Sequence, residues 1–224
     1  MDKAGYALIE TMRVREGRLP FLDRHLARLT RSLAELGLPK PTQDLTRLAA
    51  PFAETGDAVL RLEVLDGRAS VTVRDLPALD PPAVIMASEP HHPYRHKTTD
   101  RDCFEDAAEE ALVAEADDAL LVTPEGWVAE GTTWSVFWWD GDRLRTPALE
   151  LGILPGIARA RVLELERAAE GGAGERHPRG SLEGKSLFLA NAVRGVVPIA
   201  SLDGAAVPAD SRTADLARRF WPDA

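Results

Sequence analysis

The clearest pattern in the chain is an apolar stripe that predicts one amphipathic helix. The stripe repeats at steps of four and three residues and consists of Leu22, Leu26, Leu29, Leu33 and Leu36. We expect Asp23 to cap the start of this helix, and Gly37 and Pro39 to end it. Beside the stripe lie the polar residues His25, Arg28 and Ser32. Helix arginines are usually solvated, so spacing alone leaves a functional role for Arg28 as the less common alternative.

Alternating apolar and polar positions predict strands on both sides of that helix. Residues 7–15 alternate and end at Glu16-Gly17, which indicates a strand followed by a hairpin. Asp66-Gly67 is a stronger hairpin signal, between expected strands at 59–65 and 69–74. The remaining expected strands cover residues 84–87, 119–122, 127–129, 132–139, 143–145, 186–190 and 196–202.

Further helices are expected at residues 45–50, after residue 100 as far as about 115, and after Pro155 as far as about 169. Thr98, Thr99 and Asp100 are suitable caps for the second of these. Its expected buried side consists of Phe104, Ala107, Ala108, Ala111 and Leu112. This mixture predicts an α/β fold with a small N-terminal domain, residues 1–88, and a larger C-terminal domain, residues 89–224.

The composition restricts the class of protein. The chain has 224 residues, 45% hydrophobic and 28% charged, which is ordinary for a globular protein with a full core. It has no apolar run long enough to span a membrane and no pattern of an export signal, and its one cysteine, Cys103, fits a reducing cytoplasm. A net charge of −9 argues against nucleic acids and anionic membranes as partners.

Two isolated residues are candidates for chemistry. Lys97 is one of only four lysines and stands beside His96 and two threonines, before an expected helix. A desolvated lysine can form a Schiff base with a carbonyl group, although a surface lysine before a helix is the commoner case. Glu130 follows an apolar strand and precedes Gly131. It is either a solvated acid or a carboxylate that keeps a pyridine nitrogen protonated.

Two segments rich in small residues could bind an anion through backbone amides. Residues 154–159, with sequence LPGIAR, run from a turn into a helix, where free amides and the helix dipole suit a phosphate group. Residues 189–195, with sequence LANAVRG, follow an expected strand. Each signal is weak by itself, because many helices begin in this way.

Other site types are not indicated. The chain has no metal-ligand spacing among its histidines and Cys103, and we expect His91 and His92 on a loop surface. Cys103 itself is expected to be a buried apolar residue. Trp134, Trp138 and Trp139 fall in one expected strand and suit a core or a subunit interface.

Taken together, the motifs occur in an order that resembles the class IV aminotransferases, the fold-type IV pyridoxal-phosphate (PLP) enzymes. The resemblance covers residues 7–203 and rests on IETMRV, LDRHLARLTRSLAELG, HKTTDR, VAEGTTWSVFWWDGDRLRTP, GILPGIARARVLEL and LFLANAVRGVVPI. It implies a two-domain enzyme with PLP at the domain interface, acting as a homodimer. By the same resemblance, Lys97 would hold PLP covalently and Glu130 would pair with its ring nitrogen.

The resemblance also implies how the phosphate is bound. Arg28 would contact it, aided by two backbone segments whose members are Gly156, Ile157 and Ala158, and Asn191, Ala192 and Val193. Some family features are missing here. Ala158 and Ala192 lack a hydroxyl group that the family often has, Ser135 replaces a frequent asparagine, and the usual Gly-Asp-Gly turn ahead of IETMRV is absent. We therefore expect phosphate binding to depend on Arg28 and backbone amides.

Within the family, IETMRV and the Asn-Ala pair in LANAVRG are most similar to aminodeoxychorismate lyases of folate biosynthesis, which release 4-aminobenzoate and pyruvate. Thr11 matches a lyase threonine that assists proton transfer, and Lys97 would be the general base. Their charge suggests Arg194 or Arg13 as the residue that binds the carboxylates of an anionic amino substrate. The similarity to the lyases also implies aminodeoxychorismate synthase as a partner. The alternatives are an aminotransferase for branched-chain or D-amino acids, and a weakly active PLP-binding homologue.

Overall fold

A computed structural model describes residues 5–166 and 175–222 of the chain. The residues divide into two compact units: residues 1–78 with 96–100, and residues 79–95 with 101–224. Each unit combines helices with β-sheet, which confirms the predicted α/β class. This division differs from the expected one in two ways. The boundary at which the chain first passes from one unit to the other lies between Ala78 and Leu79 instead of after residue 88. Lys97 belongs to the first unit instead of the C-terminal domain.

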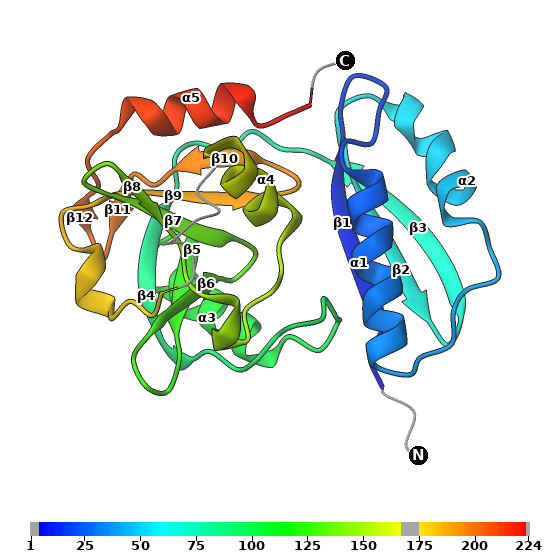
Figure 1. The fold of residues 1–224 in the computed structure, drawn as a ribbon, viewed down its shortest axis with the longest axis horizontal. Coiled ribbons are helices and arrows are strands. Elements are labelled where there is room, and N and C mark those ends of the chain that lie inside the picture. Colours follow the sequence, from blue (N-terminus) through cyan, green and yellow to red (C-terminus); the bar gives the residue numbers. More distant parts are fainter. Residues whose placement is uncertain (1–4, 167–174, 223–224) are drawn as a thin grey trace. The chain divides into compact units, whose positions relative to one another are not determined.

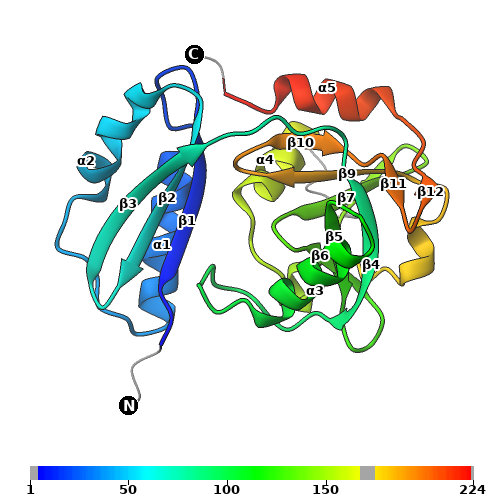
Figure 2. The ribbon, with the colours of Figure 1, turned by 180° about the vertical axis from the view of Figure 1, so that it is seen from behind.

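The first unit is a three-stranded antiparallel sheet covered on one face by a helix. The strands β1 (Leu8–Val14), β2 (Ala58–Leu65) and β3 (Arg68–Asp75) pair in that order. Figures 1 and 2, seen from opposite sides, show α1 (Leu22–Glu35) on one face only. Leu29 and Leu33 of α1 pack there against Leu8, Met12 and Leu60 of the sheet. The predicted leucine stripe therefore forms the core of this unit, through burial of apolar surface.

The ends of α1 are confirmed in part. Gly37 follows the helix with φ +64°, a conformation that favours glycine, as expected. At the other end Phe21, with φ +64°, occupies the N-cap position without a side-chain cap, so the expected capping by Asp23 is wrong. Asp23 lies in the first turn, where its charge suits the helix dipole. The expected hairpin after β1 is confirmed only as a short turn: Arg15 and Arg18 exchange two backbone hydrogen bonds across Glu16-Gly17, and β1 itself pairs with the distant β2.

The other elements of the first unit follow the prediction closely. The hairpin of β2 and β3 turns at Asp66-Gly67. Helix α2 (Leu45–Ala49) starts at Asp44, whose carboxylate accepts the amides of Thr46 and Arg47. The chain then continues through Pro51 as the 3-10 helix η1 (Ala50–Thr55). Proline is tolerated at this position because the N–H groups of the first residues of a helix have no acceptor within the helix.

Residues 96–100 return to the first unit and pair with β1. Leu8 and Thr98 form an antiparallel bridge, the Ile9 amide donates to the Lys97 carbonyl at 2.8 Å, and the Thr99 amide donates to the Ala7 carbonyl at 2.9 Å. The Ala7 amide donates in turn to the Thr99 hydroxyl at 2.9 Å. The expectation that residues 98–100 cap the next helix is therefore wrong, because these residues bind to the sheet instead.

The second unit contains two sheets. One has the order β12-β11-β4-β5-β6 and the other the order β10-β9-β7-β8. The strands of the first sheet are β4 (Ala83–Pro90), β5 (Asp118–Val122), β6 (Val128–Gly131), β11 (Ser201–Leu202) and β12 (Ala205–Ala206). Those of the second are β7 (Ser135–Asp140), β8 (Arg143–Arg145), β9 (Ser186–Asn191) and β10 (Gly195–Pro198). Val84, Leu120, Trp138 and Leu189 from both sheets share one core cluster.

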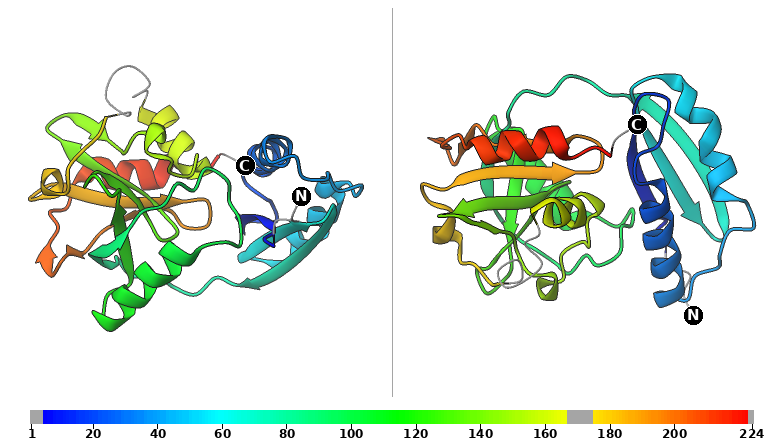
Figure 3. Two further views of the ribbon diagram at one scale, coloured as in Figure 1. Left: turned by 90° about the horizontal axis from the view of Figure 1, so that it is seen from below. Right: turned by 45° about the horizontal axis from the view of Figure 1, so that its top comes forward.

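Helices pack against these sheets. The second unit has α3 (Asp102–Val113), α4 (Ile157–Glu166) and α5 (Ser211–Arg219), with short 3-10 helices η2 (Leu149–Leu151) and η3 (Arg179–Leu182). Figure 3 shows α5 lying along β10. This helix was not predicted, and it is fixed by a hydrogen bond of 3.0 Å from the Trp139 indole to the Thr213 hydroxyl. The end of the helix expected at 155–169 lies partly outside the described residues.

The buried side of α3 differs from the expected one. Cys103, Phe104, Ala107 and Ala111 are buried, which confirms the interpretation of Cys103 as an apolar core residue. Leu112 is 76% exposed and Ala108 is also exposed, so their expected burial is wrong. Positions 103, 104, 107 and 111 form one narrow face of the helix, and Leu112 lies outside it. Trp134, Trp138 and Trp139 are buried within the second unit, as the core alternative required.

Candidate functional site

Glu130 is a buried carboxylate near the end of β6. It is 5% exposed and accepts hydrogen bonds from two directions. The His91 Nε2 atom lies 3.0 Å from Glu130 Oε1. The Leu154 amide lies 3.1 Å from Oε1 and 3.3 Å from Oε2. Glu130 is therefore not the solvated acid that strand ends usually carry, and a carboxylate kept in such a place needs these donors.

His91 contradicts the expectation of a loop surface, since it is 1% exposed. Its amide donates to the Val122 carbonyl at 2.7 Å, and its ring packs edge-on against Phe104 at 5.9 Å between centroids. His92, by contrast, is exposed. Neighbouring histidines in a sequence give no sign of which one is buried, because the two side chains of an extended segment point in opposite directions.

The corner after Glu130 is fixed by a second buried acid. Asp118 accepts the Thr132 amide at 3.0 Å and the Thr132 hydroxyl at 2.9 Å. Burial raises the pKa of Asp118, although the hydrogen bonds from Thr132 oppose that shift. Arg101 donates to the Thr132 carbonyl at 2.5 Å. These bonds hold the backbone on the far side of Gly131 and so restrict the position of Glu130.

The start of α4 has the features expected of an anion site. The first amides of a helix have no internal acceptor, and Ile157 and Ala158 provide such amides. A Cβ atom on Gly156 would lie 2.9 Å from the Ser135 hydroxyl, so only glycine lets these two segments approach so closely. Arg159, 7% exposed, lies behind this turn. Burial lowers the pKa of Arg159, while the charges of Glu150 and Glu130 raise it.

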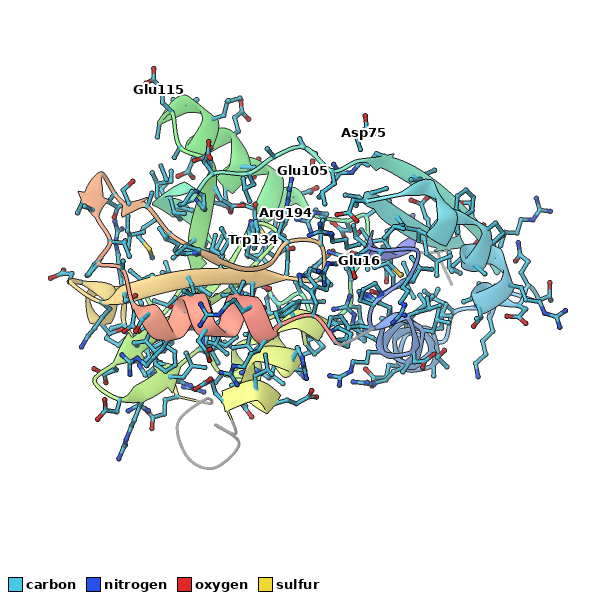
Figure 4. All side chains as sticks on the ribbon, turned by 90° about the horizontal axis from the view of Figure 1, so that it is seen from above. Glu16, Asp75, Glu105, Glu115, Trp134 and Arg194 are labelled. Carbon is cyan, nitrogen blue, oxygen red and sulfur yellow. The ribbon has the colours of Figure 1, made fainter. Side chains whose placement is uncertain are left out.

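The loop after β9 is partly closed on itself. The Asn191 side-chain oxygen accepts the Val193 amide at 3.0 Å and the Arg194 amide at 2.8 Å. The Val193 amide, which was expected to contact the phosphate, is therefore already used within the loop. Figure 4 labels Arg194 on this loop. Its side chain is partly exposed, as a substrate-binding arginine must be.

In the first unit, Arg28 is paired with a buried acid that was not predicted. Arg28 Nε donates to Glu10 Oε1 at 2.9 Å, and a second guanidinium nitrogen donates to Oε2 at 2.5 Å. His25 Nδ1 lies 2.6 Å from the same Oε2. Burial raises the pKa of Glu10, but Arg28 and His25 together outweigh it and lower the pKa to about 2. Burial lowers the pKa of His25.

Lys97 lies in the same unit as Arg28. Its backbone is held against β1, and its positive charge is close enough to His25 to lower the pKa of that imidazole. The preceding His96 Nδ1 lies 3.1 Å from the Ser32 hydroxyl of α1. Ser32 and His25, the polar neighbours of the leucine stripe, are thus both buried beside residues that the sequence singled out. Their position beside the leucine stripe marked His25 and Ser32 in the sequence, whereas no sequence pattern marked Glu10 as the buried partner of His25.

Thr11 and Arg13 lie on β1 between the fully buried positions. Both side chains are partly exposed, and strand alternation places them on the face of β1 opposite Glu10 and Met12. Arg13 forms an ion pair with Asp57. A substrate carboxylate at Arg13 would compete with that pair.

The predicted residues thus fall into two groups. Lys97, Arg28, Thr11 and Arg13 belong to the first unit, and Glu130, the α4 turn and the β9 loop belong to the second. In the part of the chain that the structure describes, no cluster of three His, Cys, Asp or Glu side chains could hold a metal ion. Within the same described ranges, no helix is long and apolar enough to cross a membrane.

Comparison with known proteins gives one consistent family. Residues 7–202 match the family model described as amino-transferase class IV. The aminodeoxychorismate lyase of Bacillus subtilis is 24% identical in an alignment that is 242 residues long with its gaps. The alignment covers 89% of this chain and 78% of the relative.

Solved structures give the same result for the fold. A fold IV transaminase from Curtobacterium pusillum is 26% identical, with a TM-score of 0.81 over 96% of this chain and 83% of its own. The branched-chain aminotransferase of Thermoproteus uzoniensis, 23% identical, has a TM-score of 0.84 over 96% of this chain and 84% of its own. Lyases and aminotransferases are therefore both similar to this chain.

Proposed function

The chain belongs to the class IV aminotransferases, a family of PLP-dependent enzymes, and on that premise we propose that it is an aminodeoxychorismate lyase. The reaction would release 4-aminobenzoate and pyruvate. The observation that carries this proposal is the similarity to the Bacillus subtilis lyase over most of the chain. The position of Thr11 on the partly exposed face of β1 supports it, because a proton donor must be accessible to substrate.

The residues of the chain fit PLP as a cofactor. Glu130 offers Oε2, which accepts only the Leu154 amide among the described residues, to a protonated ring nitrogen. The phosphate would be held by Arg28 and by the amides of Ile157 and Ala158 at the start of α4. Two guanidinium nitrogens of Arg28 donate to Glu10, and a phosphate oxygen bound by Arg28 would add to that pair.

Ser135 would replace the hydroxyl groups that Ala158 and Ala192 lack. Its hydroxyl lies against Gly156, at the turn into α4, as the distance of 2.9 Å to a hypothetical Gly156 Cβ shows. Its side chain is buried, with 9% exposed. A hydroxyl in this place can donate to a phosphate oxygen next to the helix amides. Phosphate binding would then use one side-chain hydroxyl, although from a different element than usual.

The bound cofactor would act as an electron sink for the carbon next to the substrate amine. Lys97 would hold PLP until substrate arrives, and its freed amine would then take the proton from that carbon. Thr11 would give a proton to the leaving enolpyruvate. Arg194 or Arg13 would bind a substrate carboxylate, and at Arg13 the substrate would compete with Asp57.

The lyase activity can be tested directly. Cofactor-loaded protein is mixed with chorismate, glutamine and an aminodeoxychorismate synthase, and 4-aminobenzoate is followed by its fluorescence. We expect rapid release that is lost in Lys97→Ala. A protein that carries the visible absorbance of lysine-bound PLP but forms no 4-aminobenzoate contradicts the lyase proposal.

Transamination is the second candidate, because the Curtobacterium transaminase is 26% identical over nearly the whole chain. An aminotransferase would pass the amino group of a branched-chain or D-amino acid to a 2-oxo acid. Incubation with such amino acids and 2-oxoglutarate, followed by measurement of the new amino acid, distinguishes it from the lyase. Cytoplasmic location, a homodimer and association with the synthase belong to the same proposal.

A further inference from the structure

His91 and Glu130 form a buried pair whose hydrogen-bond roles are fixed by their surroundings. His91 Nδ1 is buried and has no hydrogen-bond partner among the described residues. A protonated Nδ1 would leave a buried donor unsatisfied, which is costly. The proton of the neutral ring therefore lies on Nε2, which donates to Glu130 Oε1 at 3.0 Å.

The donors are distributed unequally over the two carboxylate oxygens. Oε1 accepts from both His91 and the Leu154 amide, whereas Oε2 accepts only the more distant Leu154 contact among the described residues. Each carboxylate oxygen has two acceptor sites. Oε1 is thereby saturated, and Oε2 is the oxygen with capacity for a further donor.

The position of the His91 ring is itself fixed. Its backbone is bonded to Val122, and its ring contacts Phe104, which is 2% exposed. Phe104 also contacts Tyr94, at 4.9 Å between ring centroids, and the Arg101 guanidinium lies 4.8 Å from the Phe104 ring. A donor held in this way can hold the carboxylate in one orientation.

We propose that His91 is the positioning residue that orients Glu130 toward the ring nitrogen of the cofactor, leaving Oε2 free to accept its N–H. This inference rests on the proposed PLP dependence. It assigns a role to a histidine that the family resemblance did not identify. A purely structural role for His91, by contrast, would need only the ring that packs on Phe104.

Two substitutions separate these roles. His91→Phe keeps an aromatic ring against Phe104 but removes the donor, while His91→Gln keeps an N–H near the place of Nε2 without the ring. His92→Phe is the matched control, because the neighbouring His92 is exposed. Glu130→Gln serves as the reference for losing the partner of the ring nitrogen.

The measurement compares two ligands bound to the cofactor-free protein, followed by the quenching of tryptophan fluorescence. One is PLP and the other is its 1-deaza analogue, in which the ring nitrogen is replaced by carbon. The preference for PLP over the analogue reports the interaction with the ring nitrogen alone. Urea unfolding of each cofactor-free variant, followed by circular dichroism, separates binding from stability.

We expect His91→Phe to reduce the preference for PLP about tenfold, as for loss of a hydrogen bond to a charged group. His91→Gln and His92→Phe should keep the preference, and Glu130→Gln should abolish it. If His91→Phe does not fold, His91→Asn replaces it, since its amide is too short to reach Glu130.

The outcomes distinguish this inference from the proposed function. A wild-type protein that binds neither PLP nor the analogue overturns both. If the wild type prefers PLP and Glu130→Gln loses the preference, while His91→Phe retains it, the PLP proposal stands and the role of His91 is overturned. Equal weakening of both ligands in His91→Phe, with lower stability, also overturns it, because that is the effect of packing alone.

Discussion

At the scale of single residues, two buried carboxylates are the main feature of this protein. Glu10 accepts from Arg28 and His25, and Glu130 accepts from His91 and the Leu154 amide. A buried carboxylate without such partners would be strongly unfavourable. Each carboxylate also lies beside a residue predicted to bind the cofactor or is itself one. The same bonds therefore serve stability and the proposed site.

Removal of the charge of Glu10 should destabilise the first unit strongly. Glu10→Gln removes the negative charge that faces the buried Arg28 guanidinium, which costs about 3 kcal/mol. Glu63→Gln, which breaks the partly exposed pair with Arg61 in the same sheet, is the control and should cost less than about 1 kcal/mol. Urea unfolding followed by circular dichroism measures both. Equal costs would show that the Glu10 pair does not hold this unit together.

Stability should fall as the pH decreases below 6.5. The folded protein lowers the pKa of His25 below 6.5 by burial, so the unfolded chain binds more protons there and is favoured as the pH falls. Glu10, whose pKa is lowered from 4.5 to about 2, adds a second loss of stability between those values. The urea midpoint should therefore be lower at pH 5 than at pH 7.5. His25→Asn, which keeps a donor for Glu10 without titrating, should reduce that difference.

Ser135 gives a test of the phosphate site. Ser135→Ala should weaken PLP about tenfold, which corresponds to one hydrogen bond to a charged phosphate. It should not change the affinity for pyridoxal, which lacks the phosphate group. Ser70→Ala, on the exposed strand β3, is the control. Fluorescence titration of the cofactor-free protein measures the affinity of each variant for PLP and for pyridoxal. Equal weakening of the two affinities in Ser135→Ala would contradict the proposed contact.

At the scale of elements, turns determine how the site residues are presented. Gly152, with φ +82°, follows η2 and lies close to Pro93, while Gly126, with φ +86°, turns between β5 and β6 in open space. The Gly152 carbonyl accepts the Tyr94 amide at 2.7 Å, and Leu154 two residues later donates to Glu130. The connection after η2 therefore joins the segment of His91 to the carboxylate that His91 contacts.

Alanine substitutions at these two glycines should differ in cost. Gly126→Ala introduces only the strain of a positive φ, about 1 kcal/mol. Gly152→Ala adds a clash, since its Cβ would lie 2.8 Å from Pro93 Cβ and 3.1 Å from Pro93 Cα. We expect a total of about 3 kcal/mol, because a backbone atom cannot simply rotate away. The urea midpoints of the two variants measure the difference, and equal midpoints would show that Pro93 moves easily.

At the scale of the whole molecule, the residues that can report unfolding, the tryptophans and the cysteine, are unevenly distributed between the two units. All five tryptophans and Cys103 belong to the second unit. Burial raises the pKa of the Cys103 thiol, so it should not react while this unit is folded. We expect its alkylation by iodoacetamide to follow the tryptophan transition across a urea series. Reaction under native conditions would show that α3 opens independently.

The sequence by itself determined the local features of this fold. The leucine stripe gave α1, Asp66-Gly67 gave the β2–β3 hairpin, and the ordered motifs gave the family. These features depend on periodicity and turn chemistry, which act over a few residues. Lys97, Glu130 and Arg28 were identified from the motifs, and their roles stay predictions.

Only the tertiary structure decided the partners of those residues. Glu10 and Arg28 are 18 residues apart, and His91 and Glu130 are 39 apart. Whether such side chains meet depends on the strand and helix faces that pack together. The same reason explains why Thr99 binds β1 instead of capping α3, and why His91 is buried while His92 is exposed. Long-range packing decides between positions that local chemistry treats alike.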